Sequence, residues 1–167
     1  MDSVSAKLRE IGITVIEKDE TIRVIGSDHM KPTKVKTLPY PGFPTDMQPQ
    51  MATLLTTVEG TSIVNEGVWD NRYRYVEQLT LMGAKVQVDG KTAVITGVEK
   101  LISAPVRAVD LRAGAAMIIA GLMADGVTEI ENIEYIDRGY EKIVEKFTAL
   151  GADIRRVDVD ESELKEI

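Results

Sequence analysis

The sequence predicts an α/β (α+β) fold built from repeated βαβαββ units, each ordered strand, helix, strand, helix and hairpin. The first observation is that apolar-faced helical segments end at Gly12, Gly83 and Gly151, glycines that lie 71 and 68 positions apart. The second is that a short β-prone run follows each of these glycines. A period of this length is typical of one supersecondary unit repeated along a chain.

The first unit, residues 1–30, is predicted to be the tail of one repeat. Residues 3–11 carry apolar side chains at helical spacing, and Gly12 suits a helix C-terminus because glycine enters the left-handed conformation without penalty. Residues 13–16 and 21–25 then predict a β-hairpin.

The second unit, residues 31–98, is predicted to be a complete repeat. An extended run ends near Phe43, and the order predicted after it is helix, strand, helix and hairpin. These segments are 47–58, 62–65, 72–82, and the pair 84–88 and 92–96 around Asp89-Gly-Lys91.

The third unit, residues 99–167, is predicted to lack its last hairpin. Residues 111–123 are apolar on all sides, as in a buried helix. A strand at 127–130, a helix from Arg138 to Leu150 and a strand at 152–157 are predicted to follow. Gly126 precedes Arg138 by 12 residues, the same interval as from Gly60 to Arg72. The three units form a single partial domain, residues 1–167.

Composition excludes several classes of function. The chain has 167 residues, 44% of them hydrophobic, which suffices for a domain-sized core. No apolar run reaches the roughly 20 residues that a membrane helix needs, and no secretory signal is visible at the N-terminus. A net charge of −7 argues against nucleic acid or a membrane surface as partner. The absence of cysteine excludes disulfides and thiolate chemistry.

Asp46 and Asp110 stand at two similar strand-to-helix corners. Aspartate is a favoured N-cap, worth about 0.5–2 kcal/mol over alanine, so capping is the simpler interpretation of both. Pro49 fits a first helical turn after Asp46, and Thr45 with Gln48 forms an alternative capping box. A shared site made by the two aspartates is the other interpretation.

Three arginines are predicted to lie in first helical turns: Arg72, Arg112 and Arg138. A cation there opposes the helix dipole at a cost of about 0.3–1 kcal/mol. Arginines beside helix N-termini can bind carboxylate and phosphate groups, and they can equally form salt bridges with nearby acids. Both interpretations stay open at this level.

The chain has no self-sufficient catalytic set. It has no serine–histidine pair, no glycine-rich phosphate loop and no cluster of metal-ligand residues, and its only histidine, His29, lies in a polar loop-like stretch. Neither a metal nor a cofactor is expected.

Four motifs resemble one family, the UDP-N-acetylglucosamine 1-carboxyvinyltransferases, which are enolpyruvyl transferases of bacterial peptidoglycan synthesis. They are Phe43-Pro-Thr-Asp-Met-Gln48, Val68-Trp-Asp-Asn-Arg-Tyr73, Ala108-Val-Asp-Leu-Arg-Ala113 and Ile136-Asp-Arg-Gly-Tyr-Glu141. The resemblance covers nearly the whole chain. It implies an inside-out α/β barrel, of which this chain is most of one domain from the C-terminal half.

The resemblance also implies roles for individual residues. Asp46 matches the general base at the sugar hydroxyl, and Asp110 and Arg138 match residues at the reacting centre. The substrate-binding set is Asp46, Val68, Trp69, Arg72, Arg112 and Arg138. Val68 and Trp69 match contacts to the UDP-sugar, although the family often has phenylalanine where Trp69 stands. The arginines match contacts to phosphoenolpyruvate.

Other family features fall outside this chain: the proton-donating loop, a lysine–asparagine pair and a further arginine. The isolated chain is therefore expected not to turn over substrate, and its expected partner is the missing half of the parent chain. An unpaired sheet edge in the third unit would invite self-association. The expected location is the bacterial cytoplasm. The shikimate-pathway enolpyruvyl transferase and a non-catalytic repeat scaffold are the two alternatives.

Overall fold

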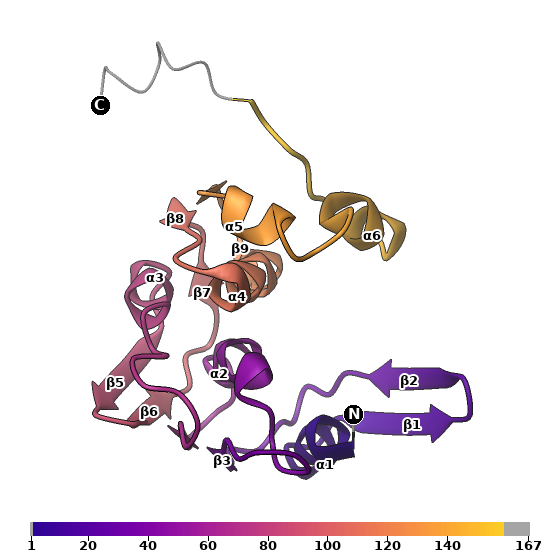
Figure 1. Ribbon diagram of the computed structural model, residues 1–167, viewed down its shortest axis with the longest axis vertical. Coiled ribbons are helices and arrows are strands. Elements are labelled where there is room, and N and C mark those ends of the chain that lie inside the picture. The colour runs from indigo at the N-terminus through magenta and orange to yellow at the C-terminus, as the bar shows by residue number, and fades with distance from the viewer. Residues whose placement is uncertain (1, 159–167) are drawn as a thin grey trace.

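A computed structural model describes residues 2–158 of the chain (Figure 1). Helices and short strands alternate along most of it. The elements are α1 (Asp2–Glu10), β1 (Thr14–Lys18), β2 (Thr21–Ile25), β3 (Lys34–Lys36), the 3₁₀ helix η1 (Thr45–Met47), α2 (Gln48–Leu55), β4 (Thr61–Asn65), α3 (Val76–Leu81), β5 (Lys85–Asp89), β6 (Thr92–Thr96), β7 (Leu101–Ile102), β8 (Val106–Arg107), α4 (Leu111–Met123), β9 (Ala124–Asp125), β10 (Ile130–Glu131), α5 (Glu134–Asp137) and α6 (Ile143–Ala149).

The largest sheet has four strands in the order β3–β4–β6–β5. Strand β3 pairs with β4 in parallel, and the other two pairs are antiparallel. Val64 of β4 lies opposite Ala93 of β6, and both are buried, as is Ile95 further along β6. Because side chains alternate along a strand, these residues face the core together.

Helices α2 and α4 contact each other near the middle of the molecule (Figure 1). Helix α4 buries residues 113–118, four of which are alanine or glycine, and also Ala120. Gly114 allows a close approach, because a Cβ there would lie 2.5 Å from a side-chain carbon of Ile136 on α5. Small residues on a buried helix let its neighbours pack closely on several sides, which accounts for the apolar character of α4.

Glycine also allows a close backbone approach just after the sheet. Gly97 follows β6, and a Cβ on it would lie 1.8 Å from the carbonyl oxygen of Val58. Its N–H donates to the carbonyl of Gly60, and the next residue, Val98, donates to the carbonyl of Thr56. The end of the hairpin is therefore fastened directly to the turn between α2 and β4.

The hairpin β1–β2 projects away from the rest of the chain (Figure 1). Val15 is its only buried residue, and every residue of β2 is exposed. Ile22 and Val24 are about half exposed, at 48% and 55%. This hairpin therefore presents apolar side chains to solvent.

The last described part packs around a separate, smaller core. Ala108, Ile118, Ile136 and Ile143 form this cluster, which joins α4 to α5 and α6. Two short parallel pairs, β7–β9 and β8–β10, connect it to the larger core. No helix within residues 2–158 is long and apolar enough to cross a membrane.

Much of the predicted element order is confirmed. Helix α4 occupies the predicted residues, both hairpins form in antiparallel register, and α1 lies where the apolar spacing placed it. The three stop glycines all have positive φ, at 102° for Gly12, 84° for Gly83 and 94° for Gly151. Their role as left-handed helix ends is therefore confirmed.

The strand predicted at 127–130 is found only at its last residue, where β10 begins. Three further predictions about later elements are wrong. The helix expected from Arg72 begins only at Val76, because Asn71 adopts φ 55° and the chain turns through residues 71–75 first. Arg138 does not open a helix; it follows the short α5, and α6 begins at Ile143. Residues 152–157 form no strand, since no other strand lies beside them in the described chain to supply ladder hydrogen bonds.

Candidate functional site

One polar pocket gathers most of the predicted site residues. Its volume is about 240 Å³, and its lining consists of Asp46, Trp69, Arg72, Asp110, Leu111, Arg112 and Arg138. These residues come from η1, the loop after β4, the start of α4 and the segment after α5. Val68 is not part of the lining, although it precedes Trp69 and is partly exposed.

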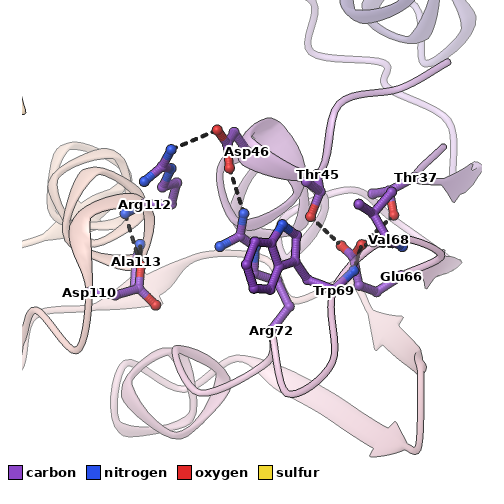
Figure 2. A network of polar contacts seen from close by, with 10 residues as sticks. All are labelled: Thr37, Thr45, Asp46, Glu66, Val68, Trp69, Arg72, Asp110, Arg112 and Ala113. Atoms are coloured by element: carbon purple, nitrogen blue, oxygen red, sulfur yellow. Dashed lines mark hydrogen bonds and ion pairs between the residues drawn. The ribbon is translucent and has the colours of Figure 1, made fainter. Parts of the chain in front are cut away.

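Asp46 is the centre of the polar contacts in this pocket (Figure 2). Its Oδ1 lies 2.6 Å from Nη2 of Arg72, and its Oδ2 lies 2.7 Å from Nη2 of Arg112. The carboxylate is half exposed, at 51%, whereas Arg72 is only 14% exposed. Two guanidinium groups from different elements therefore share one carboxylate.

The capping prediction for Asp46 is wrong. Asp46 lies inside the 3₁₀ helix η1, and α2 begins two residues later at Gln48, after an N-cap residue, Met47, that makes no side-chain cap bond. The capping box is also wrong, because the hydroxyl of Thr45 donates to Glu66 instead. The 3₁₀ turn moves the helix start beyond Asp46, so its carboxylate is free to bind arginines. Pro49 does lie in the first turn of α2, as predicted.

The two arginines set the ionisation of Asp46. Partial burial, the largest single effect, raises the pKa of its carboxyl group. The hydrogen bonds and charges of Arg112 and Arg72 together outweigh burial, so the pKa of Asp46 lies below its ordinary value. The hydrogen bond to Asp46 likewise raises the pKa of Arg112. At neutral pH the Asp46–Arg112 pair is therefore in its charged form.

Asp110 is an N-cap, as predicted. Its backbone is extended, and its Oδ1 accepts from the N–H groups of Arg112 and Ala113, each at 2.9 Å. This satisfies two of the orphan donors at the start of α4. Because the carboxylate is engaged with the backbone, it contributes to the pocket mainly by fixing the start of the helix that carries Arg112.

Arg72 keeps one donor unused. Its Nε atom is buried and has no hydrogen-bond partner among the described residues. Its guanidinium carbon lies 5.9 Å from the ring centre of Trp69, within cation–π range. A buried donor without a partner costs free energy. A ligand that accepted a hydrogen bond from Nε of Arg72 would remove this cost, and its binding would be favoured.

Arg138 is the third cation of the pocket. It is exposed, lies 5.9 Å from the ring centre of Tyr135, and has no carboxylate partner within the described chain. Of the three predicted first-turn arginines, only Arg112 lies in a first turn. The three nevertheless line one pocket: Arg72 from the loop after β4, Arg112 from the first turn of α4 and Arg138 from the end of α5.

The sequence-based prediction missed Glu66, which is only 1% exposed. Its Oε1 accepts from the hydroxyl of Thr37 at 2.6 Å and from the N–H groups of Val68 at 2.9 Å and Trp69 at 3.1 Å. Its Oε2 accepts from the hydroxyl of Thr45 at 3.0 Å. A glutamate directly after a predicted strand was a visible signal, but its partners come from two distant segments.

The pocket suits an anionic organic ligand better than a metal. No group of three or more histidine, aspartate or glutamate side chains suited to a metal ion occurs within residues 2–158. Three guanidinium groups line the pocket beside Asp46, which binds two of them, while the carboxylate of Asp110 is engaged by backbone N–H groups. Planar guanidinium groups recognise carboxylate and phosphate in two-point geometry, so the charge balance favours such groups.

Residues 1–147 match the family model of EPSP synthase (3-phosphoshikimate 1-carboxyvinyltransferase). Among curated proteins, the UDP-N-acetylglucosamine 1-carboxyvinyltransferase of Desulfofundulus thermocisternus is 51% identical over 161 residues, and that of Clostridium botulinum is 53% identical over 157. These matches cover 96% and 94% of this chain. The chain spans 66% and 38% of the lengths of the two relatives.

Two solved structures show the same fold. The enolpyruvyl transferase NikO from Streptomyces tendae matches 92% of this chain with a TM-score of 0.85 and 28% identity, over 36% of its own chain. An EPSP synthase from Acinetobacter baumannii matches 93% with a TM-score of 0.67 at 16% identity, also over 36% of its own chain. The second likeness bears on the fold alone.

Proposed function

The chain belongs to the enolpyruvyl transferase family of the EPSP synthase model, and from this premise we propose that it is part of a UDP-N-acetylglucosamine 1-carboxyvinyltransferase. Such an enzyme transfers enolpyruvate from phosphoenolpyruvate to the 3-hydroxyl of UDP-N-acetylglucosamine and releases phosphate. This is the first committed step of bacterial peptidoglycan synthesis, and the proposed location is the cytoplasm.

The observation that carries the proposal is the convergence of Arg72, Arg112 and Arg138 on one pocket. Phosphoenolpyruvate bears a phosphate and a carboxylate, and three guanidinium groups offer enough donors for both. The unpartnered Nε of Arg72 and the unpaired guanidinium of Arg138 supply donors that no described residue uses.

Asp46 is proposed as the general base, in agreement with the motif resemblance. In the ligand-free pocket Arg72 and Arg112 bind its carboxylate and lower its pKa, which makes it a weak base. An arriving phosphate or carboxylate competes for the same two guanidinium groups. Once they engage the substrate, the pKa of Asp46 rises, and the carboxylate can take the proton of the sugar hydroxyl as its oxygen bonds to phosphoenolpyruvate.

The remaining site residues have positioning or contact roles in this proposal. Asp110 holds the start of α4 and with it the backbone of Arg112. Trp69 lines the pocket, and its ring is a surface against which a uracil or sugar face can pack. Val68 is proposed to contact the UDP-sugar from the loop beside the pocket.

The shikimate-pathway enzyme is a weaker candidate. The curated relatives of about 50% identity are named for UDP-N-acetylglucosamine, whereas the EPSP synthase structure is 16% identical. A non-catalytic scaffold would need no cation excess in the pocket. The scaffold does not account for the three converging arginines, whereas the choice between the two transferases rests on the sequence identities.

The proposed working partner is the other part of the parent chain, and the isolated chain is proposed to be inactive. Residues 1–30, 31–98 and 99–167 are proposed as the tail of one repeat, a complete repeat and a further repeat that lacks its last hairpin; residues 159–167 of the last unit lie outside the described chain. Self-association is proposed for the isolated chain, and the exposed apolar residues of the β1–β2 hairpin are a second surface that favours it.

Titration of UDP-N-acetylglucosamine, followed by two-dimensional NMR of the labelled chain, tests the binding proposal. Shifts confined to residues around Asp46 and Trp69 are expected, and the variant R112A should weaken them. The matched control is R23A, which removes an exposed arginine on β2. Absence of any shift at millimolar ligand would support the scaffold hypothesis. Restored phosphate release on mixing with the complementary part of the enzyme would establish the reaction.

A further inference from the structure

Glu66 joins the two sides of the pocket without lining it. Its Oε2 is bound by Thr45, the residue next to Asp46, and its Oε1 is bound by the N–H groups of Val68 and Trp69. Figure 2 shows this carboxylate lying between the Thr45 side and the Val68–Trp69 loop. One side chain therefore contacts the neighbours of the proposed base and the backbone of the proposed sugar contacts.

The carboxylate is buried without a cation. No lysine, arginine or histidine forms an ion pair with Glu66 in the part of the chain that is described. Four donors bind it instead, two hydroxyls and two backbone N–H groups. A buried charge costs free energy unless hydrogen bonds replace its hydration, so each donor is held firmly in place.

The loop that Glu66 holds cannot easily take another path. The N–H of Gly67 donates to the hydroxyl of Thr37 at 2.8 Å, and that hydroxyl donates in turn to Glu66. A Cβ at Gly67 would lie 2.5 Å from the carbonyl oxygen of Thr37. The backbone at Gly67 thus lies directly against Thr37, and two residues later Trp69 lines the pocket.

We propose that Glu66 is a positioning residue that sets the placement of Trp69 relative to Asp46 and thereby the affinity of the pocket for a nucleotide sugar. This inference rests on the proposed function for its ligand, but the geometry it invokes exists without ligand. Glu66 acts through Thr45 on one side and through two backbone N–H groups on the other. It is not itself expected to touch substrate.

The first test is ligand-free amide hydrogen exchange on the variant Glu66→Gln, with Glu59→Gln as an exposed control for the same change. Glutamine keeps the shape but replaces a charged acceptor by a weaker neutral one. The amides of Val68 and Trp69 should exchange about five-fold faster in the variant, with other amides unchanged. Equal acceleration of all amides, or none at these two, would overturn the proposal.

The second test separates the two sides. Thr45→Val removes one donor and keeps the carboxylate, so exchange at Val68 and Trp69 should stay as in the parent chain. UDP-N-acetylglucosamine should bind several-fold more weakly, because the segment carrying Asp46 is released. If the parent chain binds the sugar and Thr45→Val binds it with the same affinity, the proposed connection from Glu66 through Thr45 to Asp46 is wrong. If the parent chain binds no sugar, the proposed function is wrong about the ligand. The ligand-free exchange experiment still decides whether Glu66 positions the backbone of Val68 and Trp69. Emission of Trp69, the only tryptophan, gives a further readout.

Discussion

Nη2 of Arg112 lies 2.7 Å from Oδ2 of Asp46, although the two residues are 66 positions apart in the sequence. One belongs to the 3₁₀ turn before α2 and the other to the first turn of α4. Helices α2 and α4 pack together, so the ion pair closes the end of their interface. The pocket thus forms where residues of the second and third predicted units meet.

Asp46→Asn should lower the free energy of unfolding at neutral pH by no more than about 1 kcal/mol, because solvent screens the half-exposed carboxylate. The folded pKa of Asp46 lies below its ordinary value of about 3.9, so the stabilisation is present above that value and is lost as pH falls through the folded pKa. Urea unfolding of both proteins between pH 7 and pH 3 measures this.

The stability difference between parent and Asp46→Asn should accordingly shrink toward zero at the acidic end. Asp153→Asn, at an exposed position with no ion-pair partner in the described chain, is the control and should leave stability at neutral pH unchanged. A difference that grows as the pH falls would contradict the assignment.

Alanine at Arg72, Arg112 or Arg138 should weaken binding of phosphoenolpyruvate by roughly ten-fold or more, since each substitution removes a charged donor. Arg138→Ala should do so without loss of folding stability, because Arg138 has no carboxylate partner in the described residues. Calorimetric titration measures the affinity, and R23A is again the control. An affinity unaffected by all three changes would exclude the anion site.

Asp110→Ala should cost about 1 kcal/mol of unfolding free energy, because two N–H groups at the start of α4 lose their acceptor. Asp110→Ser should restore most of this, since a serine hydroxyl can also accept at an N-cap. Denaturant unfolding compares the three proteins. Equal losses in the alanine and serine variants would mean that capping is not the reason.

Gly97→Ala should destabilise the fold by about 3 kcal/mol, because the added Cβ would lie 1.8 Å from the backbone carbonyl of Val58. Gly26→Ala is the matched control: nothing lies within 4 Å of its Cβ position, and its φ is not in the left-handed region. Its stability should stay within about 0.5 kcal/mol of the parent. Thermal unfolding distinguishes the two outcomes.

Local sequence patterns were sufficient for elements that depend on neighbours in the chain. Helix α4 was predicted to the residue because its apolar run begins after a capping aspartate and ends shortly before Asp125-Gly126. The start of α3 was not, because the hydroxyl of Tyr73 donates to the carbonyl of Val64 at 2.8 Å, with the carbonyl of Lys91 also within hydrogen-bond distance at 3.1 Å, and these contacts hold the preceding turn. Such tertiary hydrogen bonds cannot be predicted from the spacing of apolar residues along the chain.

The same distinction holds for the site. The residue types at Asp46 and the arginines suggested an anion site or salt bridges, and the structure contains the salt bridges within a pocket suited to anions. The sequence could not show that Asp46 is not the N-cap of α2, because that depends on a single 3₁₀ turn. Glu66 was missed because its hydroxyl donors, Thr37 and Thr45, lie 29 and 21 positions away.

Burial of the phenol raises the pKa of Tyr73 to about 12. Because the folded state holds this proton more tightly than the unfolded chain, the associated stabilisation is present below about pH 10 and is lost as pH rises toward the folded value. The free energy of unfolding of the parent, measured in urea, should therefore fall across this alkaline range. Tyr73→Phe should show a smaller decline there, and an identical decline would contradict the role of Tyr73.

The projecting β1–β2 hairpin has a consequence for how the chain responds to proteases. With Val15 as its only buried side chain, it gains little from the core, and a two-stranded hairpin alone is marginally stable. It should therefore open as a small cooperative unit while the β3–β4–β6–β5 sheet stays closed. Limited digestion should cut first at the turn around Asp19 and Glu20, and leave the pocket with its three arginines intact.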